Sequence, residues 1–193
     1  MRVAGIDEAG RGPLAGPVVC AAVILPEVRL PADLNDSKQL SERQRETLFD
    51  WICQNAVAYR IEFVSAASID RLNILQATLH GMRCALEGLA TAAELALIDG
   101  NRVPAGLPCP ARAVIGGDAL EPCIMAASVL AKVSRDRHMQ ALDALYPGYG
   151  FAQHKGYPTA GHRQALQQLG ACPEHRRSYA PVQRALQQHG AAK

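Results

Sequence analysis

The sequence lacks most of the features that would assign it to a secreted, membrane or repetitive class. None of its six cysteines stands in a C-x-x-C pair, and no apolar stretch approaches the roughly 18 residues that a membrane span needs. It shows no charged-then-apolar signal segment, no internal repeat and no low-complexity segment. We therefore expect a soluble, cytoplasmic protein with no membrane partner, whose cysteines are buried and reduced.

Length and charge are those of an ordinary compact protein. The 193 residues suit one domain, and a hydrophobic share of 49% is enough for a sizeable core. The formal net charge of +2 does not by itself require a nucleic-acid partner. Basic side chains nevertheless concentrate in the last third of the chain, which predicts a local basic face for a polyanion. They are Lys132, Arg135, Arg137, Lys155, Arg163, Arg176, Arg177 and Arg184, together with His138, His154, His162 and His175.

Two adjacent acids, Asp7 and Glu8, stand where the first apolar run meets a glycine-rich loop that extends to Pro17. The run, residues 2–8, is predicted to be a buried strand. Two like charges in a poorly solvated place repel and raise each other's pKa, and a hard divalent cation such as Mg²⁺ or Mn²⁺ would relieve that repulsion. The alternative is that both acids are exposed and bonded to loop amides.

Strands and helices alternate along the rest of the chain. Apolar runs predict a second strand that pairs with the first, and a strand, a crossover helix and a further strand predict a parallel pairing that brings Asp7 and Asp99 together. The further strands are expected at 18–25, 59–64, 95–99 and from 111 toward Asp118. The helices are expected at 41–56, 67–89, 122–145, 160–169 and 180–188, and the first of them has a capping box at Ser41. Loops are expected at 26–40 and 146–158.

An apolar strand that runs into glycine and an acid occurs three times. Four carboxylates, Asp7, Glu8, Asp99 and Asp118, are therefore predicted to converge on one rim of a mixed sheet, where open α/β sheets place their sites. The absence of histidine and cysteine from these positions favours Mg²⁺ or Mn²⁺ over zinc. Two such ions about 4 Å apart would serve an in-line displacement at phosphorus, so a phosphodiester is the fitting substrate.

Six motifs in a fixed order resemble those of bacterial ribonuclease HII, a type 2 ribonuclease H family. The resemblance runs from residue 5 to Val182 and so covers nearly the whole chain. The motifs are Gly5–Pro13, Leu34–Lys38, Ile98–Asn101, Gly117–Asp118, Ala126–Asp136 and His154–Thr159.

The resemblance implies an α/β fold of the ribonuclease H type, with a mixed five-stranded sheet flanked by helices and a short helical C-terminal region. It implies one catalytic domain over 1–193, with a core at about 1–145 and substrate-binding loops and helices at about 146–190. The implied enzyme is an endonuclease that cuts the RNA strand of RNA/DNA hybrids and nicks duplex DNA 5′ to an embedded ribonucleotide. Mn²⁺ or Mg²⁺ would be held by Asp7, Glu8, Asp99 and Asp118. We expect a monomer, and no sliding-clamp motif is seen.

The same resemblance assigns substrate contacts. The backbone of Gly10, Arg11 and Gly12 would meet the 2′-hydroxyl, which suits a group that both donates and accepts hydrogen bonds. Tyr157 would stack on the following sugar and prefer a deoxyribose there. Ser37, Lys38, Ser128, Lys132, His154 and Lys155 match positions near the phosphate backbone. The chain departs from many relatives in having Gly116 where they have lysine.

Several plainer interpretations stay open. The glycines of the first loop weakly resemble a dinucleotide fingerprint, and Cys172 with His175 could be half of a zinc site. Lys132 could be merely solvated, Tyr157 a loop anchor, and 176–179 either a phosphate clamp or a salt-bridged closing turn. A different metal nuclease on the same fold and a non-catalytic hybrid-binding protein are the alternative functions.

Overall fold

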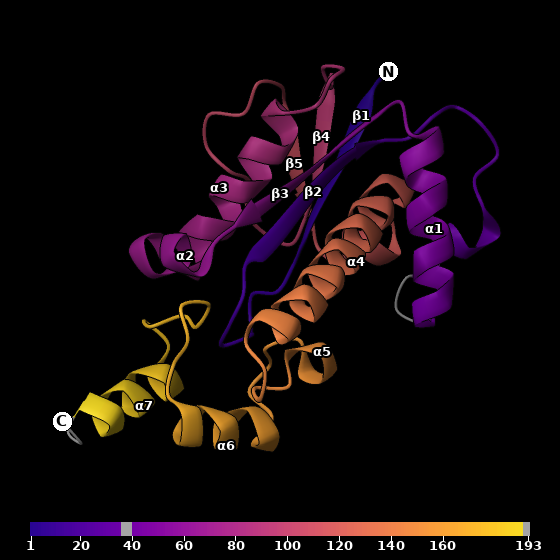
Figure 1. The fold of residues 1–193 in the computed structure, drawn as a ribbon. Coiled ribbons are helices and arrows are strands. Elements are labelled where there is room, and N and C mark those ends of the chain that lie inside the picture. Colours follow the sequence, from indigo (N-terminus) through magenta and orange to yellow (C-terminus); the bar gives the residue numbers. More distant parts are fainter. Residues whose placement is uncertain (36–39, 191–193) are drawn as a thin grey trace.

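The computed structural model describes residues 1–35 and 40–190. Two predicted substrate contacts, Ser37 and Lys38, lie outside the described residues, so their role stays a prediction. In the described part, helices cover both faces of a five-stranded sheet, and the helices between residues 151 and 190 follow as a C-terminal region beyond one end of the sheet (Figure 1). This arrangement confirms the predicted α/β fold.

The sheet is mixed in direction. Its strands are β1 (Val3–Ala9), β2 (Val18–Ile24), β3 (Ala58–Val64), β4 (Leu95–Asp99) and β5 (Ala111–Val114), in the spatial order β3-β2-β1-β4-β5. β2 lies antiparallel to β1 and to β3, whereas β4 lies parallel to β1 and to β5. Both predicted pairings, of the first two strands and of the first with the fourth, are confirmed.

Helices pack on the two faces as separate layers. α1 (Glu42–Asn55) and α4 (Pro122–Leu145) cover one face, and α2 (Ala66–Leu72) and α3 (Ile74–Glu87) cover the other (Figure 1). Every residue of β2 is buried, because β2 lies inside the sheet with helices on both sides.

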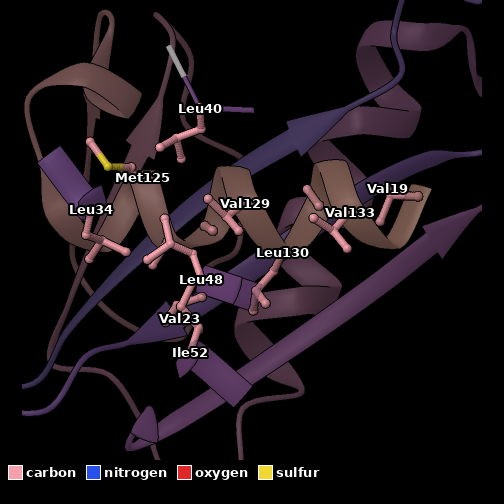
Figure 2. Close-up of a cluster of buried hydrophobic side chains, with 14 residues drawn as sticks. Val19, Val23, Leu34, Leu40, Leu48, Ile52, Met125, Val129, Leu130 and Val133 are labelled. Atoms are coloured by element: carbon pink, nitrogen blue, oxygen red, sulfur yellow. The ribbon is translucent and has the colours of Figure 1, made fainter. Parts of the chain in front are cut away.

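The core cluster between the sheet and the α1/α4 layer joins distant parts of the sequence. Figure 2 shows side chains of α4 meeting those of α1 and β2, with Leu34 and Leu40 at one end of the cluster. The labelled members are Val19, Val23, Leu34, Leu40, Leu48, Ile52, Met125, Val129, Leu130 and Val133.

Small residues let α4 lie directly against the sheet. Ala126, Ala127 and Ala131 are fully buried. Gly5 of β1 has no room for a side chain, because a Cβ there would stand 2.0 Å from the carbonyl carbon of Cys123. The predicted small residues at this contact are therefore confirmed.

Two helices, α1 and α4, begin at the residues that the sequence predicted. The Ser41 hydroxyl accepts from the Gln44 N–H, and the Gln44 side chain accepts from the Ser41 N–H, which completes the capping box of α1. Pro122 occupies the first turn of α4, where its missing N–H costs nothing.

Two predictions about helices were wrong. A single helix was expected over 67–89, but Asn73, with a φ of 66°, ends α2, and its side chain accepts from the Gln76 N–H to start α3. Apolar residues keep helical spacing across this break, so periodicity does not reveal it. The loop expected over 146–158 contains the short helix α5 (Phe151–His154).

The C-terminal region holds the two predicted closing helices, α6 (Ala160–Leu169) and α7 (Ala180–Gly190). All six cysteines have free thiols, but only Cys20 and Cys172 are buried, so the predicted burial is wrong for the others. Among the described residues, no helix is both long and apolar enough to span a bilayer.

Candidate active site

The four predicted acids come from three segments that meet at one edge of the sheet. The parallel register pairs Ile6 of β1 with Ile98 of β4, so Asp7 and Asp99 stand side by side one residue later. Asp118 lies in the 3₁₀ turn η3 (Gly117–Ala119) after β5, and its backbone N–H donates to Asp99 Oδ1 at 3.3 Å. The fold thus gathers residues that are far apart in the sequence.

The adjacent acids Asp7 and Glu8 point toward opposite faces of the sheet. Side chains alternate along a strand, and Ile6 packs against α3, so Glu8 shares the α3 face while Asp7 faces α4. The Ser128 side chain of α4 hydrogen-bonds to Asp7, and Glu8 borders a hollow lined in part by α3. The two carboxylates therefore flank the sheet edge from both sides.

Burial and like charge raise the pKa of both acids. Asp7 is only 6% exposed, and burial, followed by the charges of Glu8 and Asp99, raises its pKa well above the ordinary value. The Glu8 N–H, 2.7 Å from Asp7 Oδ1, opposes that rise. Burial also raises the pKa of Glu8, and the Arg11 guanidinium, 3.6 Å away, lowers it only in part.

The donors at this edge suit a hard divalent cation in type and charge. Carboxylate oxygens are the ligands that Mg²⁺ and Mn²⁺ prefer, and a cation would remove the repulsion that raises the pKa of Asp7. Within residues 1–35 and 40–190, however, no three histidine, cysteine, aspartate or glutamate side chains already form a ligating group. The acids are gathered but not preassembled, and an ion would have to draw them together.

Arg176, in the turn before α7, holds the first glycine-rich loop from behind. It is fully buried, and its guanidinium donates to the carbonyl oxygens of Gly10 at 2.6 Å, Arg11 at 2.9 Å and Gly16 at 3.0 Å. Asp70 of α2 anchors the same turn by accepting from the backbone N–H groups of the next two residues at 2.9 and 2.8 Å. Segment 176–179 is therefore a closing turn, and its buried Arg176 bonds to carbonyl oxygens of the glycine loop. Sequence analysis missed Asp70, and nothing in its local pattern marks it.

Arg135 of α4 braces the far end of that loop. Its guanidinium donates to the carbonyl oxygens of Pro17 at 2.9 Å, Lys155 at 2.9 Å and Ala15 at 3.1 Å. Burial, and then the charge of Arg176, lowers its pKa to about 10. Arg135 and Arg176 lie in the interior, so the prediction that they contribute to a basic surface is wrong.

The glycine loop, α4 and Tyr157 surround a hollow of about 350 Å³. Tyr157 is 44% exposed, and its ring lies 3.5 Å from where a Cβ on Gly12 would stand. Lys132 borders the hollow while its Nζ pairs with Asp136 at 2.8 Å. The lining comprises Glu8, Ala9, Gly10, Arg11, Gly12, Ser128, Lys132 and Tyr157, so it joins the acidic edge to most of the predicted substrate contacts.

His154 and Lys155 are engaged with their own loop. His154 Nδ1 accepts from the Gly156 N–H at 3.1 Å, and Nε2 donates to the Tyr149 carbonyl at 2.7 Å. The Lys155 ammonium donates to the Ala152 carbonyl. The backbone of Lys155 is left-handed and ends α5. Both side chains shape the loop that carries Tyr157.

Comparisons with known proteins agree with the motifs. The sequence model described as Ribonuclease HII matches residues 4–182. Ribonuclease HII of Xylella fastidiosa (strain M12) is 58% identical over 185 residues, which cover 95% of this chain and 79% of that protein. Ribonuclease H2 from Pyrococcus horikoshii OT3 superposes with a TM-score of 0.82 and 29% identity over 100% of both chains.

A more distant structure shows the fold alone. Bst-RNase HIII, solved in complex with Mn²⁺, has a TM-score of 0.73 at 16% identity and covers 97% of this chain and 70% of that chain. The predicted ribonuclease H-like fold is therefore confirmed, and the chain belongs to the ribonuclease HII family of nucleases.

Proposed function

We propose that this protein is a metal-dependent endoribonuclease that cuts the RNA strand of RNA/DNA hybrids and nicks duplex DNA 5′ to an embedded ribonucleotide. Family membership supports the nuclease activity. The observation that carries the substrate assignment is the hollow that places the glycine loop and Tyr157 beside Glu8. A sugar-phosphate in this hollow would meet the loop backbone and the acidic edge together.

Asp7, Glu8, Asp99 and Asp118 are the proposed ligands of Mg²⁺ or Mn²⁺. Two divalent ions, when bound, would activate the attacking water and stabilise the leaving oxygen of the phosphodiester. The pKa values of Asp7 and Glu8, raised in the free protein, would return toward the ordinary range beside a cation, so both would be ionised at neutral pH. The carboxylate donors at this edge support this choice of ion.

The glycine loop is the proposed reader of the ribose. A 2′-hydroxyl both donates and accepts, and main-chain groups flanked by glycines can reach it without side chains in the way. Because Arg176 already binds the carbonyls of Gly10 and Arg11, we assign recognition chiefly to the loop N–H groups and to the Gly12 carbonyl.

Tyr157 is the proposed sensor of the following sugar. Its partly exposed ring next to Gly12 can stack on one sugar while the loop binds the ribose before it. Residues 146–190 would thus contribute to substrate binding through Tyr157. Ser128 and Lys132, which line the same hollow, are the proposed phosphate contacts, and they position the strand without reading its sequence.

Cleavage of a DNA duplex that holds one ribonucleotide tests the proposal. We expect cutting 5′ to the ribonucleotide with Mg²⁺ or Mn²⁺, none with chelator, and none in a matched all-DNA duplex. Asp99→Asn should abolish turnover and retain duplex binding. Cleavage of the all-DNA duplex would point to another metal nuclease on this fold, and binding without turnover by the unmodified protein would point to a hybrid-binding protein.

A further inference from the structure

Three histidine rings gather under the loop that carries Tyr157, and none of them borders the hollow. His162 of α6 and His175 of the closing turn are 0% and 1% exposed. The His154 and His162 rings stack at 4.4 Å, and Phe151 packs edge-on against His162 at 5.6 Å. Titratable side chains buried this deeply must have their hydrogen bonds satisfied internally.

Only one arrangement of protons satisfies the two buried rings. The Cys172 N–H donates to His175 Nδ1 at 3.0 Å, so the proton of His175 lies on Nε2. That Nε2 stands 3.0 Å from His162 Nε2, which must then accept, leaving the His162 proton on Nδ1. His162 Nδ1 donates to the carbonyl oxygen of Tyr157 at 3.0 Å. A directed chain of neutral histidines therefore ends on the Tyr157 backbone.

The same chain begins at the far end of the glycine loop, outside the lining of the hollow. The backbone of His175 forms an antiparallel bridge with Ala15 of the glycine loop, and the flanking Gly16 N–H donates to the Glu174 carbonyl at 2.9 Å. His175 is thus fixed to the glycine loop by its backbone and to Tyr157 through His162. The two residues together link the glycine loop to the Tyr157 backbone.

We propose that His175 and His162 are positioning residues that hold the Tyr157 ring beside Gly12 and thereby set the preference for a ribonucleotide followed by a deoxyribonucleotide. The inference rests on the proposed role of Tyr157. Burial supports the neutral state of both rings, since it lowers the pKa of His162 and lowers that of His175 to about 4. A charge on either ring would place two donors face to face.

Two near-isosteric variants separate positioning from mere packing. In His162→Asn the amide N–H can take the place of Nδ1 and keep the bond to Tyr157, whereas in His162→Gln the amide reaches the place of Nε2 and keeps only the bond to His175. Junction preference is measured as kcat/KM on a duplex with one ribonucleotide relative to a uniform RNA strand paired with DNA. We expect His162→Gln to lower this ratio by about fivefold and His162→Asn to leave it near the parent value.

Thermal unfolding and a double mutant complete the test. In a Tyr157→Ala background, His162→Gln should cause no further loss of preference, because both act through one ring. Equal ratios for the Asn and Gln variants, or a ratio that follows the unfolding midpoint alone, would overturn the positioning role. So would ¹⁵N NMR that finds the His162 proton on Nε2. A parent enzyme with no junction preference would instead refute the proposed function, and the positioning role would fall with it.

Discussion

The acidic edge and the pair of buried arginines behind the glycine loop present the same electrostatic problem with opposite sign. At the edge, burial and then the charges of Glu8 and Asp99 raise the pKa of Asp7. Behind the loop, burial and then the charge of Arg176 lower the pKa of Arg135. In each region, buried like charges lie close enough for each to destabilise the ionised form of the other.

The two regions differ in how their hydrogen bonds are satisfied. All guanidinium nitrogens of Arg135 and Arg176 donate to carbonyl oxygens of the surrounding loops. Glu8 and Asp99, by contrast, border open hollows, and Arg11 offsets the charge of Glu8 only in part. Buried charges whose bonds are complete hold the structure, whereas buried charges left facing a hollow are available to a ligand.

Removing an acid should separate activity from stability most strongly. We expect Asp7→Asn to lower the cleavage rate by about a thousandfold, because an ion ligand is lost. The free energy of unfolding should rise by about 1 kcal/mol, since a buried like charge is removed. Cleavage assays and denaturant unfolding of the same preparation measure both. A variant that is inactive because it is less stable would break the comparison.

Removing a buried arginine should instead lower the free energy of unfolding. Arg176→Met leaves the carbonyls of Gly10, Arg11 and Gly16 without their buried donor, and we expect a loss of about 3 kcal/mol in the free energy of unfolding. The exposed neighbour offers a matched control, and Arg177→Met should cost less than about 0.5 kcal/mol. Equal costs for the two variants would show that the buried guanidinium is not a brace.

A third buried group, the His175 ring, should make the free energy of unfolding depend on pH. The pKa of His175 falls from 6.5 to about 4 on folding, so the unfolded chain binds the extra proton first as pH drops. The neutral ring's stabilisation is full above about pH 6.5 and is lost toward pH 4, by about 3 kcal/mol in all. The groups that face this ring are His162, His154, Cys172 and Tyr149.

The matched variant for this prediction is His175→Asn, which keeps an acceptor for the Cys172 N–H but does not titrate. Its free energy of unfolding should vary less between pH 6.5 and 4 than that of the parent. The exposed His189→Asn should retain the parent slope. An unchanged slope in His175→Asn would mean that the ring is not held neutral.

The smallest effect is expected at the edge of the acidic site. Arg11 is half exposed, and its ion pair with Glu8 spans 3.6 Å. Arg11→Met should lower the free energy of unfolding by about 0.5 kcal/mol or less and raise the pKa of Glu8 further. NMR titration of the Glu8 carboxyl measures this, and a fall in its pKa would contradict the assigned pair.

The sequence predicted what depends on local pattern and chain order. Apolar runs located the strands, and the crossover between the first and fourth strands placed Asp7 next to Asp99. Local pattern did not reveal the break at Asn73, because apolar spacing continues through it. It also could not show that Arg135 and Arg176 are buried, since all but one of their carbonyl acceptors come from segments more than 100 residues away. The opposite orientation of Glu8 follows from strand alternation, yet only the packing of Ile6 shows which helix it faces.

The central claim is that the acidic edge binds divalent cations, and Mn²⁺ titration monitored by thermal unfolding tests it most directly. Ligands that bind only the folded state raise its stability by an amount that grows with the logarithm of their concentration relative to Kd. We predict that Mn²⁺ raises the unfolding midpoint of the parent protein and that this shift disappears in Asp7→Asn. An equal shift in both proteins, or none in the parent, would contradict the account.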